Sequence, residues 1–233
     1  LRLEEMMIPR LYLRSAAFVL LTLMLSSCTP QSERRVCFFG SSVCKGVGAQ
    51  DEHGYAYMVG ENLPRGWEYV NLSVSGNCTY DLFARYDRDM KPEQAKYVVI
   101  GLSLGNEGLH EKGFRAMLSY RENMPRLIKM LQDDGHTVIV TNNYSRADFN
   151  EVDFRDLCIV NLEVQQWDVP TVNLFGNIDD GAGHWAEGFW NGEDIWHPNT
   201  EGHAQMASAF VPSMWEALDK GKTLPVRTDM DLT

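Results

Sequence analysis

Short, largely apolar runs separated by stretches of helical periodicity restrict the fold of this chain more than any other feature of its sequence. Five such runs follow one another along the chain: RVCFFG, EYVNLSVSG, YVVIGLSLG, HTVIVTN and PTVNLFG. Strands that are apolar on both faces are typical of parallel sheets, which are covered on both sides by crossover helices. The order of the runs therefore predicts an α/β fold with five parallel strands between two layers of helices.

Length and composition fit one domain of this kind. The chain has 233 residues, of which 44% are hydrophobic and 23% are charged. Chains of this size and composition fold as one well-buried globular domain. We expect a flavodoxin-like, three-layer α/β/α sandwich over residues 35–220, followed by a C-terminal tail over residues 221–233.

Prolines mark two positions where the predicted helices should be interrupted. Residues 114–131 carry apolar side chains at helical spacing, but Pro125 predicts a break or a second helix start within them. The last helix should begin near Thr200, with Asn199 beside it as a cap, and Pro212 should kink it. Its apolar face should carry Met206, Phe210, Val211, Met214, Trp215 and Leu218.

Residues 1–27 have the features of a secretory signal peptide. Two arginines precede an apolar run over residues 16–25, which is too short to cross a hydrocarbon core of about 30 Å as a helix. The run ends in Leu-Ser-Ser-Cys, which resembles the lipobox of bacterial lipoproteins and implies that Cys28 is lipidated. We therefore expect residues 28–34 to tether the domain to a membrane of the bacterial cell envelope. An ordinary cleaved signal with a coincidental cysteine is the alternative.

Charge and cysteine content limit the partners of the chain. The net charge of −11 repels phosphate backbones, so we expect no nucleic-acid binding. In an exported protein, a disulfide between Cys44 and Cys78 is conceivable, and buried thiols are the alternative. Neither a C-x-x-C pair nor an H-x-x-x-H pair is present, so we expect no metal.

Residues suited to acyl-transfer chemistry follow the predicted strands. Ser42 comes after the first strand, Gly76 after the second and Asn106 after the third. Asp194 and His197 precede the last helix. Because open parallel sheets bind ligands at the carboxyl ends of their strands, we expect these residues to meet there. They supply a nucleophile, oxyanion donors, a general base and an acid that orients the base.

Asp194 and His197 have the spacing of an acid–base pair. On a helical turn or a tight loop, residues i and i+3 share a face, so the carboxylate can reach the imidazole Nδ1–H. This contact would fix the tautomer and leave Nε2 free to accept a proton from a serine. Taken alone, D-x-x-H is equally well explained by a solvated aspartate and a helix-capping histidine.

Together, these segments resemble the sequence blocks of the SGNH (GDSL-type) hydrolase family. The matching segments are FFGSSVCKGVGA, NLSVSGNCT, LSLGNEG and DIWHPNTEGH. The resemblance implies a serine esterase with Ser42, Asp194 and His197 as its triad. It also implies an oxyanion hole made by the N–H groups of Ser42 and Gly76 and the side chain of Asn106. The implied reaction hydrolyses carboxylic esters through an acyl-enzyme and needs no cofactor.

The chain departs from the family pattern at two positions. The family's Gly-Asp-Ser reads Gly40-Ser41-Ser42, and its Gly-x-Asn-Asp reads Leu104-Gly105-Asn106-Glu107. Ser41 is outside the implied triad, so we expect its change to alter the support of the loop rather than abolish activity. In the third block the asparagine is kept, but the neighbouring backbone should differ.

A second serine, Ser103, lies in a Gly-x-Ser-x-Gly pattern like that of the nucleophile elbow of α/β-hydrolases. An elbow serine sits on a sharp turn that leads directly into a helix. The residues that follow Ser103 are Gly105-Asn106-Glu107-Gly108, a poor helix start by intrinsic propensity. We therefore expect Ser103 to be a small polar residue late in a buried strand. An α/β-hydrolase with Ser103 as nucleophile is an alternative.

Residues 175–196 form a long segment rich in glycine and aromatic residues, which is a candidate substrate loop. Its tryptophans Trp185, Trp190 and Trp196 could stack on a sugar or an acyl group, or could pack the loop onto the domain. An acidic, envelope-tethered esterase with such a loop favours O-acetyl groups on glycans as substrates. The alternatives are a lysophospholipase or thioesterase of the same family, and a non-catalytic, surface glycan-binding lipoprotein with the same fold.

Overall fold

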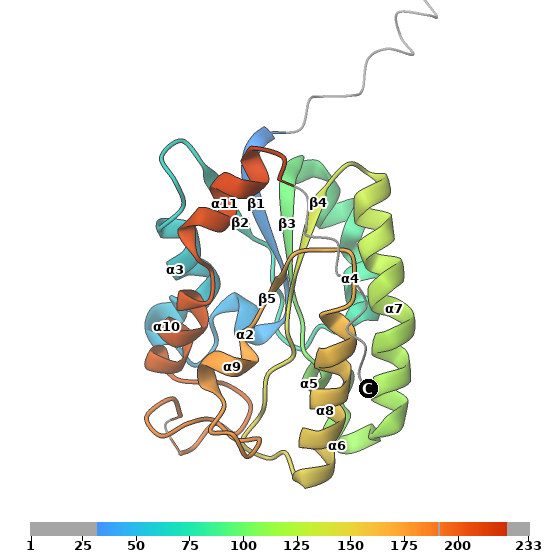
Figure 1. Cartoon of the computed structure of the whole chain (residues 1–233), viewed down its shortest axis with the longest axis vertical. Helices are drawn as coiled ribbons and strands as arrows, with labels where there is room; N and C mark the ends of the chain where they lie inside the picture. The colour runs from blue at the N-terminus through green and yellow to red at the C-terminus, as the bar shows by residue number, and fades with distance from the viewer. Residues whose placement is uncertain (1–31, 191, 223–233) are drawn as a thin grey trace, which may run out of the picture. The chain divides into compact units, whose positions relative to one another are not determined.

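The computed structural model describes residues 32–190 and 192–222, and its centre is a five-stranded sheet (Figure 1). The strands lie in the order β2-β1-β3-β4-β5, and every neighbouring pair is parallel. This is the strand order of flavodoxin-like sheets. The predicted α/β fold is therefore confirmed. The strands are β1 (Ser32–Gly40), β2 (Glu68–Asn71), β3 (Ala95–Gly101), β4 (Thr137–Thr141) and β5 (Thr171–Val172).

Helices cover both faces of the sheet (Figure 1). One layer is formed by α3 (Tyr55–Glu61), α10 (Thr200–Ser208) and α11 (Pro212–Asp219). The other is formed by α4 (Thr79–Arg85), α7 (Phe114–Asp133) and α8 (Glu151–Val164). Short helices follow three strand ends: α2 (Ser42–Lys45), α5 (Leu104–Glu107) with α6 (Leu109–Lys112), and α9 (Phe175–Ile178). Further short helical turns span Gln50–Glu52, Tyr86–Met90 and Lys91–Glu93.

Successive side chains of the central strands pack alternately against the two layers of helices. Val36 and Phe38 of β1 pack in the cluster that contains α3, α10 and α11. Cys37 and Phe39 pack in the cluster that contains α4, α7 and α8. All four side chains are fully buried. The apolar runs in the sequence therefore correspond to strands with two buried faces.

Strand β1 begins earlier than the sequence predicts. Its first residue, Ser32, pairs with Ala95 of β3, so the last part of the predicted tether belongs to the sheet. Glu33 and Arg34 are polar and exposed, and this end of the strand has no apolar pattern. A prediction based on hydrophobic runs therefore cannot detect the backbone pairing that extends β1.

Pro125 does not interrupt its helix. It lies inside α7, which is a single helix, so the predicted break is wrong. A proline in a helix removes one backbone hydrogen bond and crowds the preceding turn. On both sides of it, Met124 and Leu127 are fully buried against the sheet, and this packing of the apolar face offsets the loss.

Pro212 does not kink one long helix, as predicted, but begins a second, separate helix. It is the first residue of α11, where its missing N–H would have had no intrahelical partner. Val211, expected on the apolar face, is instead the N-cap of α11 and is exposed. At the start of α10, the Asn199 side chain accepts a hydrogen bond from the Gly202 N–H at 2.9 Å, which confirms its predicted role as a cap.

The predicted signal peptide and the lipid-bearing Cys28 lie outside the described residues. In the part of the chain that is described, no helix is both long enough and apolar enough to cross a membrane.

His203 in the first turn of α10 is a buried structural residue. Its side chain is fully buried, its Nδ1 accepts a hydrogen bond from the Tyr55 N–H at 3.2 Å, and its Nε2 donates to the Val47 carbonyl at 2.9 Å. Burial lowers its pKa from 6.5 to about 4. The folded protein therefore holds this imidazole neutral, as both contacts require.

This burial predicts a loss of stability on acidification. Between pH 6.5 and about 4 the unfolded chain protonates His203 and the folded chain does not, so stability falls as the pH falls through this window. In His203→Gln we expect a lower melting temperature at pH 7 and a shallower decline between pH 6.5 and 4. Thermal unfolding followed by circular dichroism at several pH values measures both. As a control, His110→Gln removes a histidine whose pKa is raised by its hydrogen bond to Asp153, and it should make the decline no shallower.

Candidate active site

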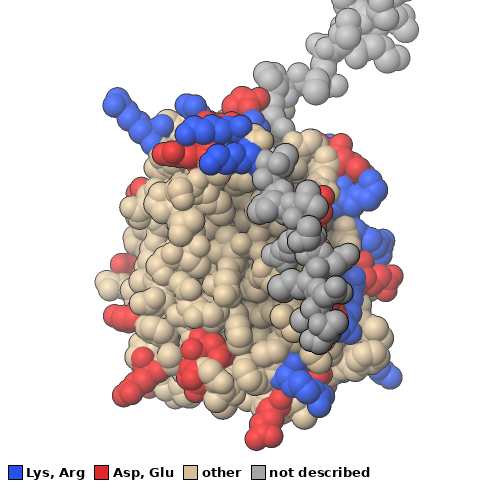
Figure 2. Space-filling view, viewed as in Figure 1, with Lys and Arg blue, Asp and Glu red and all other residues tan. Residues whose placement is uncertain are grey.

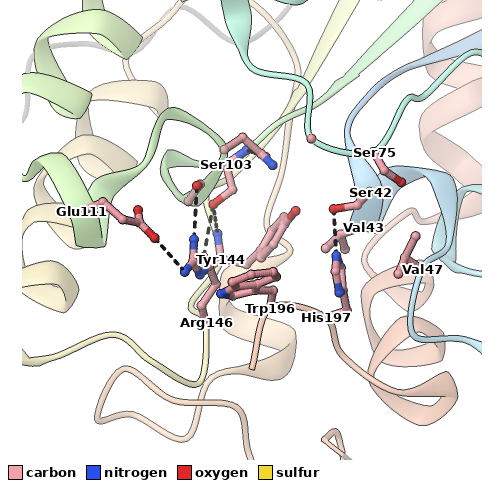
Figure 3. A pocket seen from close by; sticks show the side chains of 13 residues that line it. Ser42, Val43, Val47, Ser75, Ser103, Glu111, Tyr144, Arg146, Trp196 and His197 are labelled. Atoms are coloured by element: carbon pink, nitrogen blue, oxygen red, sulfur yellow. Dashed lines mark hydrogen bonds and ion pairs between the residues drawn. The ribbon is translucent and has the colours of Figure 1, made fainter. Parts of the chain in front are cut away.

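Ser42, His197 and Asp194 form a continuous chain of hydrogen bonds. His197 Nε2 lies 2.9 Å from Ser42 Oγ (Figure 3), and on the other side of the ring Nδ1 lies 2.6 Å from Asp194 Oδ2. The carboxylate can only accept, so Nδ1 carries the hydrogen and Nε2 accepts from the serine hydroxyl. The structure thus brings Ser42 to a histidine 155 positions further along the chain.

The close approach of two strand ends positions Ser42. A Cβ atom added at Gly40, the last residue of β1, would lie 2.2 Å from the Gly101 carbonyl oxygen of β3, so only glycine fits. Ser41 follows with an extended backbone, and its N–H donates to the Gly101 oxygen at 3.3 Å. Helix α2 then begins at Ser42 itself. The Ser41 side chain is fully buried and takes no part in the hydrogen-bond chain.

The loop before α10 holds the other two residues. Asp194 Oδ1 accepts a hydrogen bond from the Trp196 N–H at 2.9 Å, while Oδ2 binds His197. Burial acts to raise the pKa of Asp194, but the hydrogen bonds from Trp196 and His197 outweigh it and lower the pKa. The aspartate is therefore ionised and fixed in orientation, which keeps the imidazole in one tautomer.

Gly76 and Asn106 lie at the same end of the sheet and line the same cleft as Ser42. Gly76 has a left-handed backbone, with φ of 80°, in the loop that follows β2. The Asn106 Oδ1 atom accepts a hydrogen bond from the Ser103 N–H at 2.8 Å. Because an amide N–H donates only to the side-chain oxygen, the Asn106 amino group is the part left available at the cleft.

The cleft has a volume of about 440 Å³ and extends from Ser42 to a polar wall (Figure 3). Arg146 forms this wall, with hydrogen bonds to the carboxylates of Asp148 and Glu111. Its guanidinium lies 5.7 Å from the ring centre of Trp196. Sequence reasoning missed Arg146 and Glu111, although Arg146 lies just beyond the end of β4, a position that the same strand-end argument covers.

Ser103 has a structural role. Its side chain is 2% exposed, and its hydroxyl lies 3.2 Å from the Tyr144 carbonyl oxygen and 3.3 Å from the Tyr144 nitrogen. It is the N-cap of α5, not a strand residue, so the predicted strand position is wrong. Three of the four residues expected to resist a helix, Gly105, Asn106 and Glu107, nevertheless lie in α5, because Ser103 and Asn106 make a reciprocal capping box, and Gly108 ends the helix as its left-handed C-cap.

Of the three candidate tryptophans, Trp196 alone is among the residues that line the described cleft, and it is 54% exposed. Trp185 is 7% exposed and packs in the core with Ile178 of α9, which is the second of the two roles that the sequence allowed, packing the loop onto the domain. Trp190 donates its indole N–H to the Asp194 carbonyl oxygen at 2.6 Å and thereby supports the loop. Cys44 and Cys78 are both free thiols, so the conceivable disulfide is absent.

Comparison with known protein families identifies the family of this chain. The GDSL-like lipase/acylhydrolase family matches residues 38–205, a span that contains every residue of the hydrogen-bond chain. The chain belongs to this family. It is therefore an acylhydrolase, an enzyme that hydrolyses carboxylic esters. A search of curated proteins found no match.

Solved structures share the fold at low sequence identity. An acetyl xylan esterase from Geobacillus stearothermophilus is 18% identical, with a TM-score of 0.62 over 85% of this chain and 99% of its own. The acetyl xylan esterase AlAXEase is 21% identical, with a TM-score of 0.61 over 79% and 99%. A lipase from a goat rumen metagenome is 17% identical, with a TM-score of 0.64 over 75% and 94%. Identities this low establish the similarity of fold alone.

Proposed function

We propose that Ser42 is the nucleophile of this acylhydrolase, with His197 as general base and Asp194 as the acid that orients it. The observation that carries the proposal is the unbroken chain of hydrogen bonds from Ser42 Oγ through the imidazole to Asp194 Oδ2, at 2.9 and 2.6 Å. Gly76, Asn106 and the Ser42 N–H are the proposed oxyanion donors.

The reaction follows from these positions. Ser42 Oγ attacks the ester carbonyl as its proton passes to His197 Nε2, and the Asp194 carboxylate stabilises the imidazolium. The three donors stabilise the negative charge on the tetrahedral oxygen. The intermediate collapses, the leaving alcohol takes the proton from His197, and an acyl-Ser42 ester remains. Water then gives a proton to His197 and attacks the acyl carbon. The bond from this carbon to Ser42 Oγ breaks as His197 returns the proton to Oγ, and the acid is released.

Hydrolysis of p-nitrophenyl acetate by the chain lacking residues 1–28 tests the nucleophile. We expect Ser42→Ala to lose nearly all activity and its labelling by a fluorophosphonate, because only an activated serine reacts. Ser103→Ala is the matched control; it should keep the activity and lose about 1 kcal/mol of stability with its hydrogen bonds. Loss of activity in Ser103→Ala alone would restore the elbow interpretation. An inactive, unlabelled wild type would favour a glycan-binding protein.

For the substrate, we propose short acyl esters, in particular O-acetyl groups on glycans. The Trp196 side chain is 54% exposed and lines the cleft beside the triad, and the backbone N–H of Trp196 donates to Asp194 Oδ1, so a sugar stacked on the indole would lie at a fixed distance from Ser42. The charge of Arg146 is balanced by two carboxylates, which favours a neutral ligand over an anionic lipid headgroup. Figure 2 shows acidic side chains along the lower margin, the end of the molecule toward which the strands run in Figure 1, with basic ones among them at one corner. Two of the structural neighbours described above are acetyl xylan esterases.

Replacing Trp196 tests this substrate class. In Trp196→Ala we expect kcat/KM on acetylated xylo-oligosaccharides to fall roughly 5- to 10-fold, for a stacking contribution of about 1–1.4 kcal/mol, with little change on p-nitrophenyl acetate. Trp190→Ala is the control for general damage to the loop. If the wild type releases no acetate from the oligosaccharides but hydrolyses lysophospholipids, the lipid alternative is correct.

We also propose that Cys28 carries a lipid that anchors the enzyme in a bacterial envelope membrane. The support is the lipobox-like end of the apolar segment in the sequence. In bacteria that express the full chain, Cys28→Ser should move the enzyme from the membrane fraction to the soluble fraction. Metabolic labelling with an alkyne fatty acid should mark the wild type and leave the variant unmarked. An unlabelled wild type would indicate an ordinary cleaved signal.

A further inference from the structure

Glu107 is a buried acidic residue at the end of α5, and its carboxylate joins three helices. It is 4% exposed. Its Oε1 accepts a hydrogen bond from the backbone N–H of Thr79, the first residue of α4, at 2.8 Å. Its Oε2 accepts from the Ser119 hydroxyl on α7 at 3.0 Å.

A fourth side chain closes these contacts into a ring. Asn123 of α7 donates to the Thr79 hydroxyl at 3.0 Å and to the Ser119 hydroxyl at 3.3 Å. Asn123 and Thr79 are fully buried. Lys112 donates at 2.8 Å to the backbone oxygen of Glu107, and not to its carboxylate. In the described part of the chain, the carboxylate of Glu107 takes part in these two neutral hydrogen bonds and in no ion pair.

A buried carboxylate without a cationic partner is costly, and a core of apolar residues would avoid that cost. This cost indicates that Glu107 has a role beyond holding the helices together. Its position in the chain suggests one, because it directly follows Asn106, and Thr79 is three residues after Gly76. The carboxylate thus links the two segments that carry the proposed oxyanion donors.

The segment around Gly76 is held by hydrogen bonds before and after the glycine. A Cβ atom added at Gly76 would meet nothing within 4 Å, so the loop is not held by packing at that residue. Before Gly76, the Leu72 carbonyl accepts from Arg85 at 2.7 Å and the Val74 N–H donates to the Gly40 carbonyl at 3.1 Å. After Gly76, Arg85 also donates to Asn77 Oδ1 at 2.6 Å, and the Thr79 N–H donates to Glu107, which is the contact that joins this segment to α5.

We propose that Glu107 is a positioning residue for the oxyanion hole, whose carboxylate fixes the separation of the Gly76 N–H and the Asn106 amide. The inference rests on the assignment of these two donors under the proposed function. It also gives a reason for the departure from the Asn-Asp pattern. The glutamate is one methylene longer, and an aspartate at this position would have to draw α4 and α5 together to keep both contacts.

Kinetics of p-nitrophenyl acetate hydrolysis by the full chain in detergent test the inference. In Glu107→Ala we expect kcat to fall roughly 10- to 100-fold with KM almost unchanged, because small misplacements of catalytic donors cost up to about 10²-fold. Glu107→Gln keeps the length and one acceptor, so its kcat should stay within a few-fold of wild type. Glu107→Asp keeps the charge but not the reach, so it should be slow. If Glu107→Ala does not fold, the kcat of Glu107→Gln compared with that of Glu107→Asp tests the inference instead.

Two further measurements separate positioning from general stability. Asp153→Ala removes another buried carboxylate that accepts a backbone N–H, on α8, and should lower the melting temperature without lowering kcat. Asn106→Ala should slow turnover roughly 10²–10³-fold through loss of one donor. When Glu107→Ala is added to Asn106→Ala, the further loss should shrink to a few-fold, because one of the two groups that Glu107 positions is already gone.

The outcomes are distinct. If Asn106→Ala keeps the wild-type rate, the proposed oxyanion hole is wrong and the inference falls with it. If Asn106→Ala is slow but Glu107→Ala and Glu107→Asp keep the wild-type kcat, the inference alone is wrong. It is also wrong if the losses of Asn106→Ala and Glu107→Ala multiply in the double variant.

Discussion

The contact between the ends of β1 and β3 is the constraint on which the rest of the site depends. Neither Gly40 nor Gly101 has room for a side chain, since a Cβ on the first would meet the Gly101 oxygen at 2.2 Å and one on the second would meet Cys44 Sγ at 2.4 Å. The two backbones can therefore approach closely just where the strands stop. Ser42 and the helix that carries Asn106 emerge from this point, so the proposed nucleophile and one proposed oxyanion donor share a rigid origin.

Buried polar side chains link the ends of the strands to the loops that follow them. Arg85 donates to the Gly40 carbonyl at 3.2 Å and to the Leu72 carbonyl at 2.7 Å, and it stacks 4.2 Å from the ring centre of Phe39. It thus ties the end of β1 to the segment that leaves β2. Glu107 makes the corresponding link between that segment and α5. Arg85 bonds carbonyl groups where β1 and β2 end, and Glu107 satisfies a backbone N–H at the start of α4, so both side chains pair buried backbone groups while fixing the loops in place.

Hydrophobic runs were sufficient to predict the sheet. The residues of the hydrogen-bond chain were predicted from their places at a strand end or before a helix together with the resemblance to SGNH hydrolases, because the Asp194–His197 spacing alone fits a solvated aspartate and a capping histidine equally well. The helix after Ser103 could not be predicted from propensity, since its stability comes from a reciprocal cap and from buried Leu104. The helix break predicted at Pro125 is wrong for a similar reason, because tertiary packing of α7 outweighs the local preference for a break.

The contacts of Glu107 and Arg146 were beyond sequence reasoning for a different reason. Both are charged residues that would ordinarily be exposed, and their burial depends on partners 28 and 41 positions away, namely Thr79 and Gly105. The two serines make the same point. Ser103 fits an elbow pattern and Ser42 departs from a Gly-Asp-Ser pattern, but the hydroxyl of Ser103 is bonded to the backbone of Tyr144 and that of Ser42 to an imidazole. A serine becomes a nucleophile through the base that its hydroxyl meets in the folded chain, and a short motif specifies only where such a meeting is allowed.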